Sequence, residues 1–282
     1  MPAARAARGV RLAAVADPDE GRRTRLAAGL PAYGSAAELV AAGGIDAVVL
    51  ATPVEAHLAD ARLCVEAGVT VLVEKPPAAD AAGAAELALL EPTLFVGFQR
   101  RFDPELVRLR ELGAREERLE LELVLDIERR SWSPYVVRDE ALLDLAPHLV
   151  DLAAWISGSE VEAVGAARID RSSVTLQLEL GRGTAFVTCA HDRPYRELVA
   201  VRSGGRELGR AERGGRLRRL RERLGAAGSF VACLAAELEA LAAATRGESR
   251  SELATALDGL RVMTVLDEAR LVAAPAGVEG GP

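Results

Sequence analysis

The sequence predicts an α/β protein in which a doubly wound parallel sheet is followed by an α+β domain with an open antiparallel sheet. Up to about Phe98, short runs that are apolar throughout alternate with helical stretches, which is typical of a parallel sheet covered on both faces. After Gln99, four strand-like runs follow one another without helices between them, as in an antiparallel sheet. We therefore expect two domains, residues 1–98 and 99–282.

In the first domain, four strands are predicted to alternate with four helices. The predicted strands are Val10–Ala16, Asp46–Ala51, Val69–Val73 and Thr93–Gly97, and the predicted helices are Pro18–Ala28, Ser35–Val40, Glu55–Ala67 and Ala79–Leu90. Pro18 suits a first helical turn, Ser35 with Glu38 forms a capping box, and Gly68 ends the third helix. A doubly wound sheet binds its ligands at the carboxyl ends of its strands.

The second domain is predicted to combine an antiparallel sheet with helices before and after it. The predicted strands are Leu119–Ile127, Val161–Arg168, Ser173–Leu180, Thr184–Ala190 and Glu197–Val201, with a hairpin turn at Gly181–Gly183. The predicted helices are Asp103–Leu112, Asp139–Ile156, Leu217–Arg223, Ser229–Thr245 and Ser251–Leu271, and a loose tail follows from Ala274. The arginine-rich stretch from Arg206 to Arg223 is interpreted as a solvated helix face rather than a nucleic-acid patch.

Composition excludes several classes of protein. The 282 residues carry a formal net charge of −7, and an acidic chain is a poor partner for nucleic-acid phosphates. No apolar run reaches the roughly 18 residues of a membrane span. Cys64, Cys189 and Cys233 lie far apart, with no C-x-x-C pair and no disulfide framework. We therefore expect a cytoplasmic protein with no membrane and no nucleic-acid partner.

The chain contains a single lysine, Lys75, because the other basic residues are all arginine. Lys75 follows Glu74 directly after the predicted strand Val69–Val73, where a doubly wound sheet places its ligand. A lysine can be tuned to give up its proton, whereas an arginine cannot. An ammonium held beside a carboxylate in a cleft is a candidate proton donor or acceptor. A surface ion pair at a strand end is the alternative.

A second candidate cluster combines a histidine with two carboxylates on one predicted helix. Asp144 and His148 are spaced i, i+4 and Asp151 follows His148 at i+3, so all three share one face. This is an acid/base arrangement, although a charge cluster on the helix surface stays open. A metal site is also conceivable, but no third strong ligand is apparent. Pro147 is unexplained unless the helix begins or kinks there.

Four motifs in order carry a resemblance to a known family. They are Ala51-Thr52-Pro53 with His57, Val73-Glu74-Lys75-Pro76, Val96 to Pro104, and Asp144 with His148 and Asp151. Together they resemble the Gfo/Idh/MocA oxidoreductases over about Val10 to Leu271. The resemblance implies a Rossmann-like dinucleotide-binding domain over 1–98 and a substrate-binding and oligomerisation domain over 99–282.

The resemblance also implies roles for individual residues. Lys75, Asp144 and His148 would form the catalytic set, with the histidine accepting a substrate hydroxyl proton. Asp151, Arg100 and Trp132 would contact the substrate. The cofactor would be bound by Asp17, Thr52, Pro53, His57, Glu74, Lys75 and Gln99. Asp17, at the end of its strand, suits an adenosine ribose and favours NAD over NADP.

One departure from the family pattern is serious. The ribose-binding acid normally falls about 20 residues after a strand and a G-x-G-x-x-G loop. Asp17 has 16 residues before it, and the one G-x-G, Gly181-Arg182-Gly183, lies in a hairpin. The first strand and the pyrophosphate cradle are therefore expected to be missing, leaving a vacant position between the strands at Val10 and Asp46. The two neighbours either pair directly or leave open edges. Three explanations stay open: a start assigned too late, a homologue that no longer binds cofactor, or weak cofactor binding.

Taken together, the expected function is an NAD(P)-dependent oxidoreductase acting on a sugar, inositol or related polyol. The alternative is a non-catalytic homologue that acts as a structural or regulatory partner. Because helices cover one side of the antiparallel sheet only, we also expect a homo-oligomer, a dimer or tetramer, packed through the other side. The sequence does not name the substrate.

Overall fold

The computed structural model describes residues 2–128, 140–214, 229–248 and 251–273. The chain divides into two compact units, which are described separately: Met1–Phe102 with Ser229–Leu260, and Asp103–Gly228 with Arg261–Pro282. The predicted division at residue 98 is therefore corrected, because Ser229–Leu260 joins the first unit. Ser229–Leu260 belongs to the first unit because it contacts residues that are far away in the sequence. The spacing of apolar residues in the sequence does not reveal such contacts.

The main sheet of the first unit has four strands in the order β12-β5-β4-β3. Its parallel members are β3 (Ala47–Leu50), β4 (Thr70–Val73) and β5 (Leu94–Val96), and β12 (Ala254–Thr255) is antiparallel to β5. All four residues of β4 are buried, as expected of an inner parallel strand. The predicted parallel sheet is confirmed, while β12 replaces the start of a helix predicted from Ser251.

Two further strands form a separate pair. They are β1 (Val15–Ala16) and β2 (Ala32–Tyr33), and they run parallel. The strand predicted over Val10–Ala16 is thus reduced to its last two residues. Among the described residues, β1 pairs with β2 and β3 pairs with β4, but β1 and β3 do not pair with each other. Direct pairing across the expected vacant position is therefore not what the structure shows, and both strands keep an open edge.

The helices of the first unit begin close to where their capping residues predict. They are α1 (Pro2–Ala6), α2 (Glu20–Ala27), α3 (Ala36–Ala42), α4 (Val54–Glu66), α5 (Ala81–Ala88), the 3₁₀ turn η1 (Gln99–Phe102), α10 (Phe230–Ala244) and the start of α11 (Ala256–Val272). Asp19 caps α2, which begins after Pro18 and not at it, and Ser35 accepts from the Glu38 amide as predicted. Helix α10 packs against α1 and η1.

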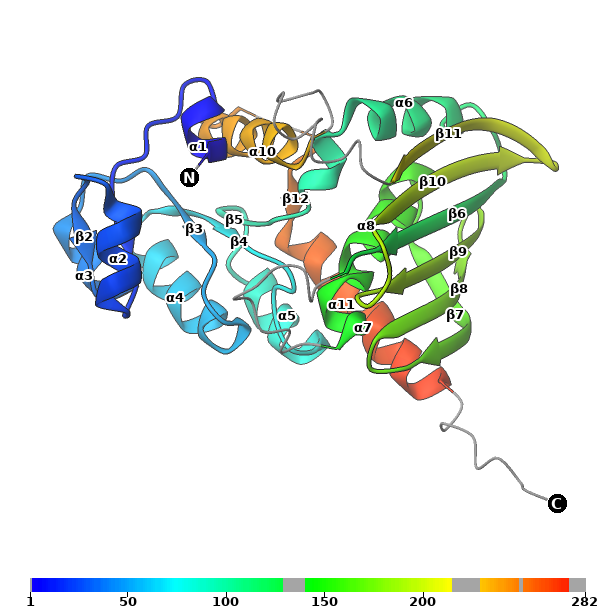
Figure 1. The fold of residues 1–282 in the computed structure, drawn as a ribbon, viewed down its shortest axis with the longest axis horizontal. Helices are drawn as coiled ribbons and strands as arrows, with labels where there is room; N and C mark the ends of the chain where they lie inside the picture. Colours follow the sequence, from blue (N-terminus) through cyan, green and yellow to red (C-terminus); the bar gives the residue numbers. More distant parts are fainter. Residues whose placement is uncertain (1, 129–139, 215–228, 249–250, 274–282) are drawn as a thin grey trace, which may run out of the picture. The chain divides into compact units, whose positions relative to one another are not determined.

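The second unit is built on a six-stranded sheet in the order β11-β10-β6-β9-β8-β7 (Figure 1). Its strands are β6 (Leu119–Asp126), β7 (Val161–Ile169), β8 (Ser173–Leu180), β9 (Gly183–Ala190), β10 (Arg196–Ser203) and β11 (Arg206–Gly214). All neighbours are antiparallel except β6 and β9, which are parallel. The predicted open antiparallel sheet is confirmed apart from that one pair.

Strand β11 corrects the reading of the arginine-rich stretch. Arg206–Gly214 is not a helix face but an edge strand paired along β10. Its arginines and glutamates form cross-strand ion pairs, as between Arg196 and Glu212, which make a charged edge strand tolerable. The helix predicted over Leu217–Arg223 lies outside the described residues.

Helices cover one face of this sheet (Figure 1). They are α6 (Pro104–Gly113), α7 (Ala141–Asp144), α8 (Ala146–Ser157) and the remainder of α11, with α8 against β6, β8 and β9. Val174, Leu176 and Leu178 share the buried face, as their alternation predicts. The opposite face carries Phe186, which is 51% exposed. In the part of the chain that the structure describes, no helix combines the length and apolar character needed to cross a membrane.

Candidate active site

The carboxyl ends of three parallel strands bring several predicted site residues to one edge of the first unit's sheet. Thr52 follows β3, Lys75 follows β4 and Gln99 follows β5. Backbone hydrogen bonds fasten these ends together, since the Glu74 amide donates to Leu50 and the Gly97 amide donates to Val73. The order of strands β3, β4 and β5 therefore assembles residues that are about 25 positions apart in the chain.

Two buried polar atoms at this edge have no hydrogen-bond partner among the described residues. They are Thr52 Oγ1 and Gln99 Oε1, and the Gln99 side chain is 4% exposed. Leaving a buried polar group unsatisfied costs about 1–3 kcal/mol, so such groups are usually paired. The hydroxyl can donate or accept and the amide oxygen accepts. The ends of β3 and β5 therefore each present one buried polar atom that a polar ligand could bind.

Glu74 is a part-buried carboxyl beside Lys75. Burial raises its pKa, while the positive charge of Lys75 and a hydrogen bond from the Lys75 amide act in the opposite direction. That amide lies 3.3 Å from Glu74 Oε2. A methyl group at Gly97 would come within 3.4 Å of the same oxygen, so this glycine lets the carboxyl pack against β5. Glu74 is thus held by the turn that carries the lysine.

His57 connects the turns after β3 and β4 from inside helix α4. Its Nε2 lies 2.9 Å from the Thr52 carbonyl oxygen and its Nδ1 lies 3.1 Å from that of Pro77. The ring is 2% exposed. Pro53 precedes the first residue of α4 as its cap position. The imidazole therefore contacts the backbone of two loops, one of which contains Lys75.

Asp17 lies at the end of β1, where its carboxylate is engaged within its own segment. Oδ1 accepts from the Asp19 amide at 2.8 Å, and the Arg22 guanidinium lies 3.1 Å from Oδ2. The hydrogen bond from Arg22 lowers the pKa of Asp17. An acid and an arginine thus stand side by side where the strand ends.

Arg100 is carried by the 3₁₀ turn η1 together with Gln99. Its guanidinium Nη1 lies 3.9 Å from the Cys233 sulfur on α10. The neighbouring Arg101 is buried and pairs with Asp258 at 3.3 Å. The turn is therefore attached on both sides to segments from near the end of the chain.

In the second unit, Asp144, His148 and Asp151 do not lie on one continuous helix as predicted. Helix α7 ends at Asp144, Leu145 interrupts it with φ −117°, and α8 begins at Ala146. Pro147 explains the break, because it occupies the first turn of α8, where a missing N–H is tolerated. His148 and Asp151 share α8, and α7 packs against it.

The burial of these three side chains bears on the two interpretations offered above, an acid/base arrangement and a charge cluster on a helix surface. Asp144, His148 and Asp151 are 7%, 8% and 2% exposed, so the alternative of a charge cluster on a helix surface is wrong. Ionisable groups are seldom buried unless they are paired or serve a function. Among the described residues, no group of three or more His, Cys, Asp or Glu side chains is arranged to hold a metal ion. Trp132, the remaining predicted substrate contact, lies outside the described residues.

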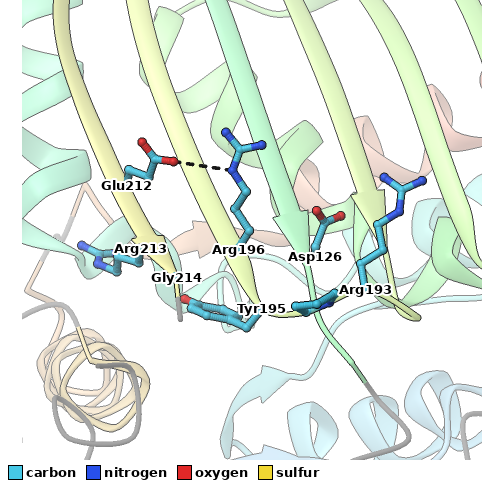
Figure 2. A pocket seen from close by; sticks show the side chains of 8 residues that line it. Asp126, Arg193, Tyr195, Arg196, Glu212, Arg213 and Gly214 are labelled. Carbon is cyan, nitrogen blue, oxygen red and sulfur yellow. Dashed lines mark ion pairs between the residues drawn. The ribbon is translucent and has the colours of Figure 1, made fainter. Parts of the chain in front are cut away.

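A hollow that the sequence analysis did not predict lies at one end of the second unit's sheet (Figure 2). Its volume is about 450 Å³, and its lining comes from the end of β6, the segment before β10 and the end of β11. The lining residues are Asp126, Arg193, Pro194, Tyr195, Arg196, Glu212, Arg213 and Gly214. Only the polar residue at the end of a predicted strand, Asp126, could have signalled it from the sequence.

Asp126 is the buried acid of this hollow. Its Oδ1 has no hydrogen-bond partner among the described residues, and burial raises its pKa against the charges of Arg193 and Arg196. Figure 2 shows the ion pair between Arg196 and Glu212, in which Arg196 Nε lies 3.5 Å from Glu212 Oε1. Burial, together with Asp126 and Asp144, raises the pKa of the Cys189 thiol to about 12. Both acids therefore lie near the same end of β9.

Known proteins match this chain in two ways: a family model matches its first part by sequence, and solved structures match nearly all of it by fold. Residues 1–95 match the Gfo/Idh/MocA model, described as an oxidoreductase family with an NAD-binding Rossmann fold. An inositol 2-dehydrogenase of Leifsonia xyli is 35% identical over 164 residues, which is 55% of this chain and 48% of that protein. Inositol 2-dehydrogenase 2 of Saccharopolyspora erythraea is 35% identical over 178 residues, 59% of this chain and 52% of that protein. The chain thus spans about half the length of the curated relatives it matches.

Solved structures resemble the fold over nearly the whole chain. A probable dehydrogenase from Thermotoga maritima superimposes with a TM-score of 0.78 at 20% identity, covering 96% of this chain and 91% of that one. GenD2 from gentamicin A biosynthesis, solved with NAD, gives a TM-score of 0.78 at 21% identity, with coverages of 98% and 90%. At this identity the likeness concerns the fold, and it confirms a Rossmann-like sheet followed by a second sheet domain. By these matches, residues 1–95 are similar to the NAD-binding Rossmann domain of the Gfo/Idh/MocA oxidoreductases.

Proposed function

We propose that the protein is an NAD(P)-dependent oxidoreductase that transfers a hydride between a nicotinamide cofactor and a hydroxyl-bearing or keto carbon of a sugar, inositol or related polyol. The observation that carries this proposal is one sheet edge. There the sole lysine of the chain accompanies oxygens of Thr52 and Gln99 that have no hydrogen-bond partner among the described residues. The inositol 2-dehydrogenases among the relatives support the substrate class.

In this proposal the residues of the first unit hold the nicotinamide end of the cofactor. Thr52 Oγ1 and Gln99 Oε1 bind polar groups at this end of the cofactor, which satisfies both buried atoms. Pro53 shapes the same turn, His57 fixes it to the turn of Lys75, and Glu74 sits beneath the lysine. When bound, the cofactor supplies the hydride donor or acceptor.

The proton is handled by this chain's own side chains. His148 accepts the substrate hydroxyl proton, Asp144 stabilises the imidazolium, and Lys75 orients the reacting oxygen. Once the hydroxyl oxygen has lost its proton, the carbon that bears this oxygen can release a hydride. Removal of the proton by a side chain is general base catalysis. Asp151, Arg100 and Trp132 bind the remaining hydroxyl groups.

We favour NAD over NADP because the lowered pKa of Asp17 keeps its carboxylate ionised, and a carboxylate at this place in a doubly wound fold suits a 2′-hydroxyl and repels a 2′-phosphate. Arg22 beside it gives NADP a possible partner, so the preference depends on this pair.

Oligomerisation and location are proposed on separate grounds. The face of the second sheet that carries exposed Phe186 also carries the Arg202–Glu122 pair, a mixture of apolar and paired charged groups suited to a second copy. We propose a homo-oligomer, a dimer or tetramer, through this face. All three cysteines are free and buried, which suits the reducing cytoplasm we propose as its location.

The test of the proposed function is a fluorescence titration of the purified chain with NADH and NADPH. Saturable binding is expected, and Thr52→Val should weaken it about 2–12-fold, the range of one ordinary hydrogen bond. Because that variant also removes an unsatisfied buried hydroxyl, its melting temperature should stay equal or rise. Thr70→Val, at a buried threonine within β4, is the matched control. Absence of binding by the unmodified chain contradicts the proposal.

A further inference from the structure

Strand β12 and the start of α11 lie beside β5, the strand that leads to Gln99, one of the residues proposed to bind the nicotinamide. Strand β12 pairs with β5, with Ala254 opposite Val96 and Thr255 opposite Phe95 (Figure 1). Strand β5 leads through Gly97 and Phe98 directly into η1, which begins at Gln99. The start of α11 is therefore positioned beside the turn that presents Gln99 and Arg100, although about 155 residues separate them in the sequence.

Asp258 joins this segment to η1. Its Oδ2 accepts from the Thr255 amide at 3.0 Å and from the Thr255 hydroxyl at 3.2 Å, which caps the first turn of α11. The same oxygen lies 3.3 Å from Arg101 Nη1. The Arg101 side chain is only 6% exposed. A buried guanidinium requires a carboxylate or another acceptor, so Asp258 serves a helix cap and an arginine at once.

Gly259 extends the contact to the turn of the lysine. A methyl group there would lie 2.8 Å from Val96 Cγ2 and 3.3 Å from Pro77 Cγ, so only glycine permits this approach of α11. Pro77 is two residues beyond Lys75, and its carbonyl oxygen is the partner of His57 Nδ1. One short stretch of α11 thus touches the turns after both β4 and β5.

We propose that Asp258 is a positioning residue for the sheet edge at the carboxyl ends of β3, β4 and β5. Through Arg101 it fixes η1, and thereby Gln99 and Arg100, in the orientation that receives cofactor and substrate. The expected effect on cofactor binding rests on the proposed function, whereas the contact of Asp258 with Arg101 is a feature of this structure. A helix cap needs only an oxygen acceptor, whereas the hold on Arg101 needs the negative charge. Asp258→Asn separates the two, because asparagine keeps the acceptor and loses the charge.

The experiment compares hydrogen exchange, measured by mass spectrometry, in peptides covering residues 97–103 and 256–262. Asp258→Asn should accelerate exchange in 97–103 about tenfold or more, the loss of one charge-assisted hydrogen bond, and leave 256–262 near its original rate. Asp80→Asn is the matched control, because Asp80 caps α5 by accepting from the Gly83 amide and has no arginine partner among the described residues. That control should leave 97–103 unchanged.

A double-mutant cycle tests whether the effect passes through Arg101. If it does, Arg101→Gln and Asp258→Asn together should accelerate exchange in 97–103 no more than either change alone. NADH affinity should fall in both single variants while the melting temperature stays near that of Asp80→Asn. Unchanged exchange in 97–103, or effects that add, would overturn the positioning role. Failure of the unmodified chain to bind NADH would overturn the proposed function instead, and the exchange cycle would still decide whether Asp258 holds the turn.

Discussion

The guanidinium of Arg22 grips the carboxylate of Asp17 at two points, with Nε 3.1 Å from Oδ2 and Nη2 3.2 Å from Oδ1. The pair joins the end of β1 to the first turn of α2. An acid at this place in a doubly wound fold selects NAD, and a free arginine selects the 2′-phosphate of NADP. Under the proposed function Asp17 would favour NAD and a released Arg22 would favour NADP, and in the structure the acid holds the arginine.

Under the proposed function, removing the acid should shift the cofactor preference toward NADP. In Asp17→Ala, Arg22 is released to meet a 2′-phosphate, and we expect the ratio of NADPH to NADH affinity to rise about tenfold or more, as for a charge-assisted bond gained. Fluorescence titration with both cofactors measures the ratio. Arg22→Ala is the control, in which NADPH affinity should fall and NADH affinity should change little. An unchanged ratio in Asp17→Ala would show that the ribose is bound elsewhere.

Lys75→Arg should keep the fold and lose most turnover. The positive charge beside Glu74 is preserved, but the planar guanidinium of arginine is larger than an ammonium and holds its donors in a fixed geometry, so it would orient the reacting oxygen differently. Steady-state kinetics with inositol and related polyols measures kcat, and circular dichroism checks folding. A near-normal kcat in the arginine variant would remove Lys75 from the catalytic set.

His148→Ala should lower kcat by about 10²–10⁴, the usual contribution of a general base. His191→Ala provides the matched control, since that histidine is part-exposed and bonds a backbone carbonyl oxygen of Arg171. Equal kcat values for the two variants would contradict the proposed role of His148. Because α8 is almost wholly buried, melting temperatures of both variants are needed beside the rates.

Glu74→Gln should stabilise the protein at neutral pH. Burial raises the pKa of Glu74 above its ordinary 4.5, so the folded state disfavours the charged form. Such a group costs stability as pH rises from its unfolded pKa through its folded pKa, and costs nothing below both. The gain in melting temperature of Glu74→Gln should thus grow from pH 5 to pH 8. Glu55→Gln, an exposed acid in α4, is the control, and a gain that shrinks with rising pH would contradict the prediction.

Phe186→Lys should disrupt the proposed homo-oligomer without unfolding the second unit. The Phe186 side chain is about half exposed on the sheet face that carries no helix among the described residues. A charge there is therefore solvated in a single copy and buried between two. Light scattering at micromolar concentration should show a dimer or tetramer for the unmodified chain and a smaller species for the variant. A monomeric unmodified chain would refute the assembly.

The sequence by itself determined the fold class and the identity of the candidate site residues. Strands such as Thr70–Val73 are apolar throughout, helices such as α3 carry their own cap at Ser35, and Lys75 stands out because it is the one lysine. These signals are local, so period, capping and composition were enough to read them. The motifs at Thr52 and Glu74 likewise follow predicted strands directly, and Asp144 lies within a predicted helix.

Tertiary structure decided what depends on contacts between distant segments. Arg206–Gly214 is a strand because β10 lies beside it, and Ala254–Thr255 is a strand because β5 does, although neither segment has a strand-like apolar pattern. The burial of His148 and Asp151 follows from packing α8 against the second sheet. The link from Asp258 to Arg101 spans 157 positions. Local pattern reports the faces of an element, but only the folded chain specifies which distant side chain meets each face.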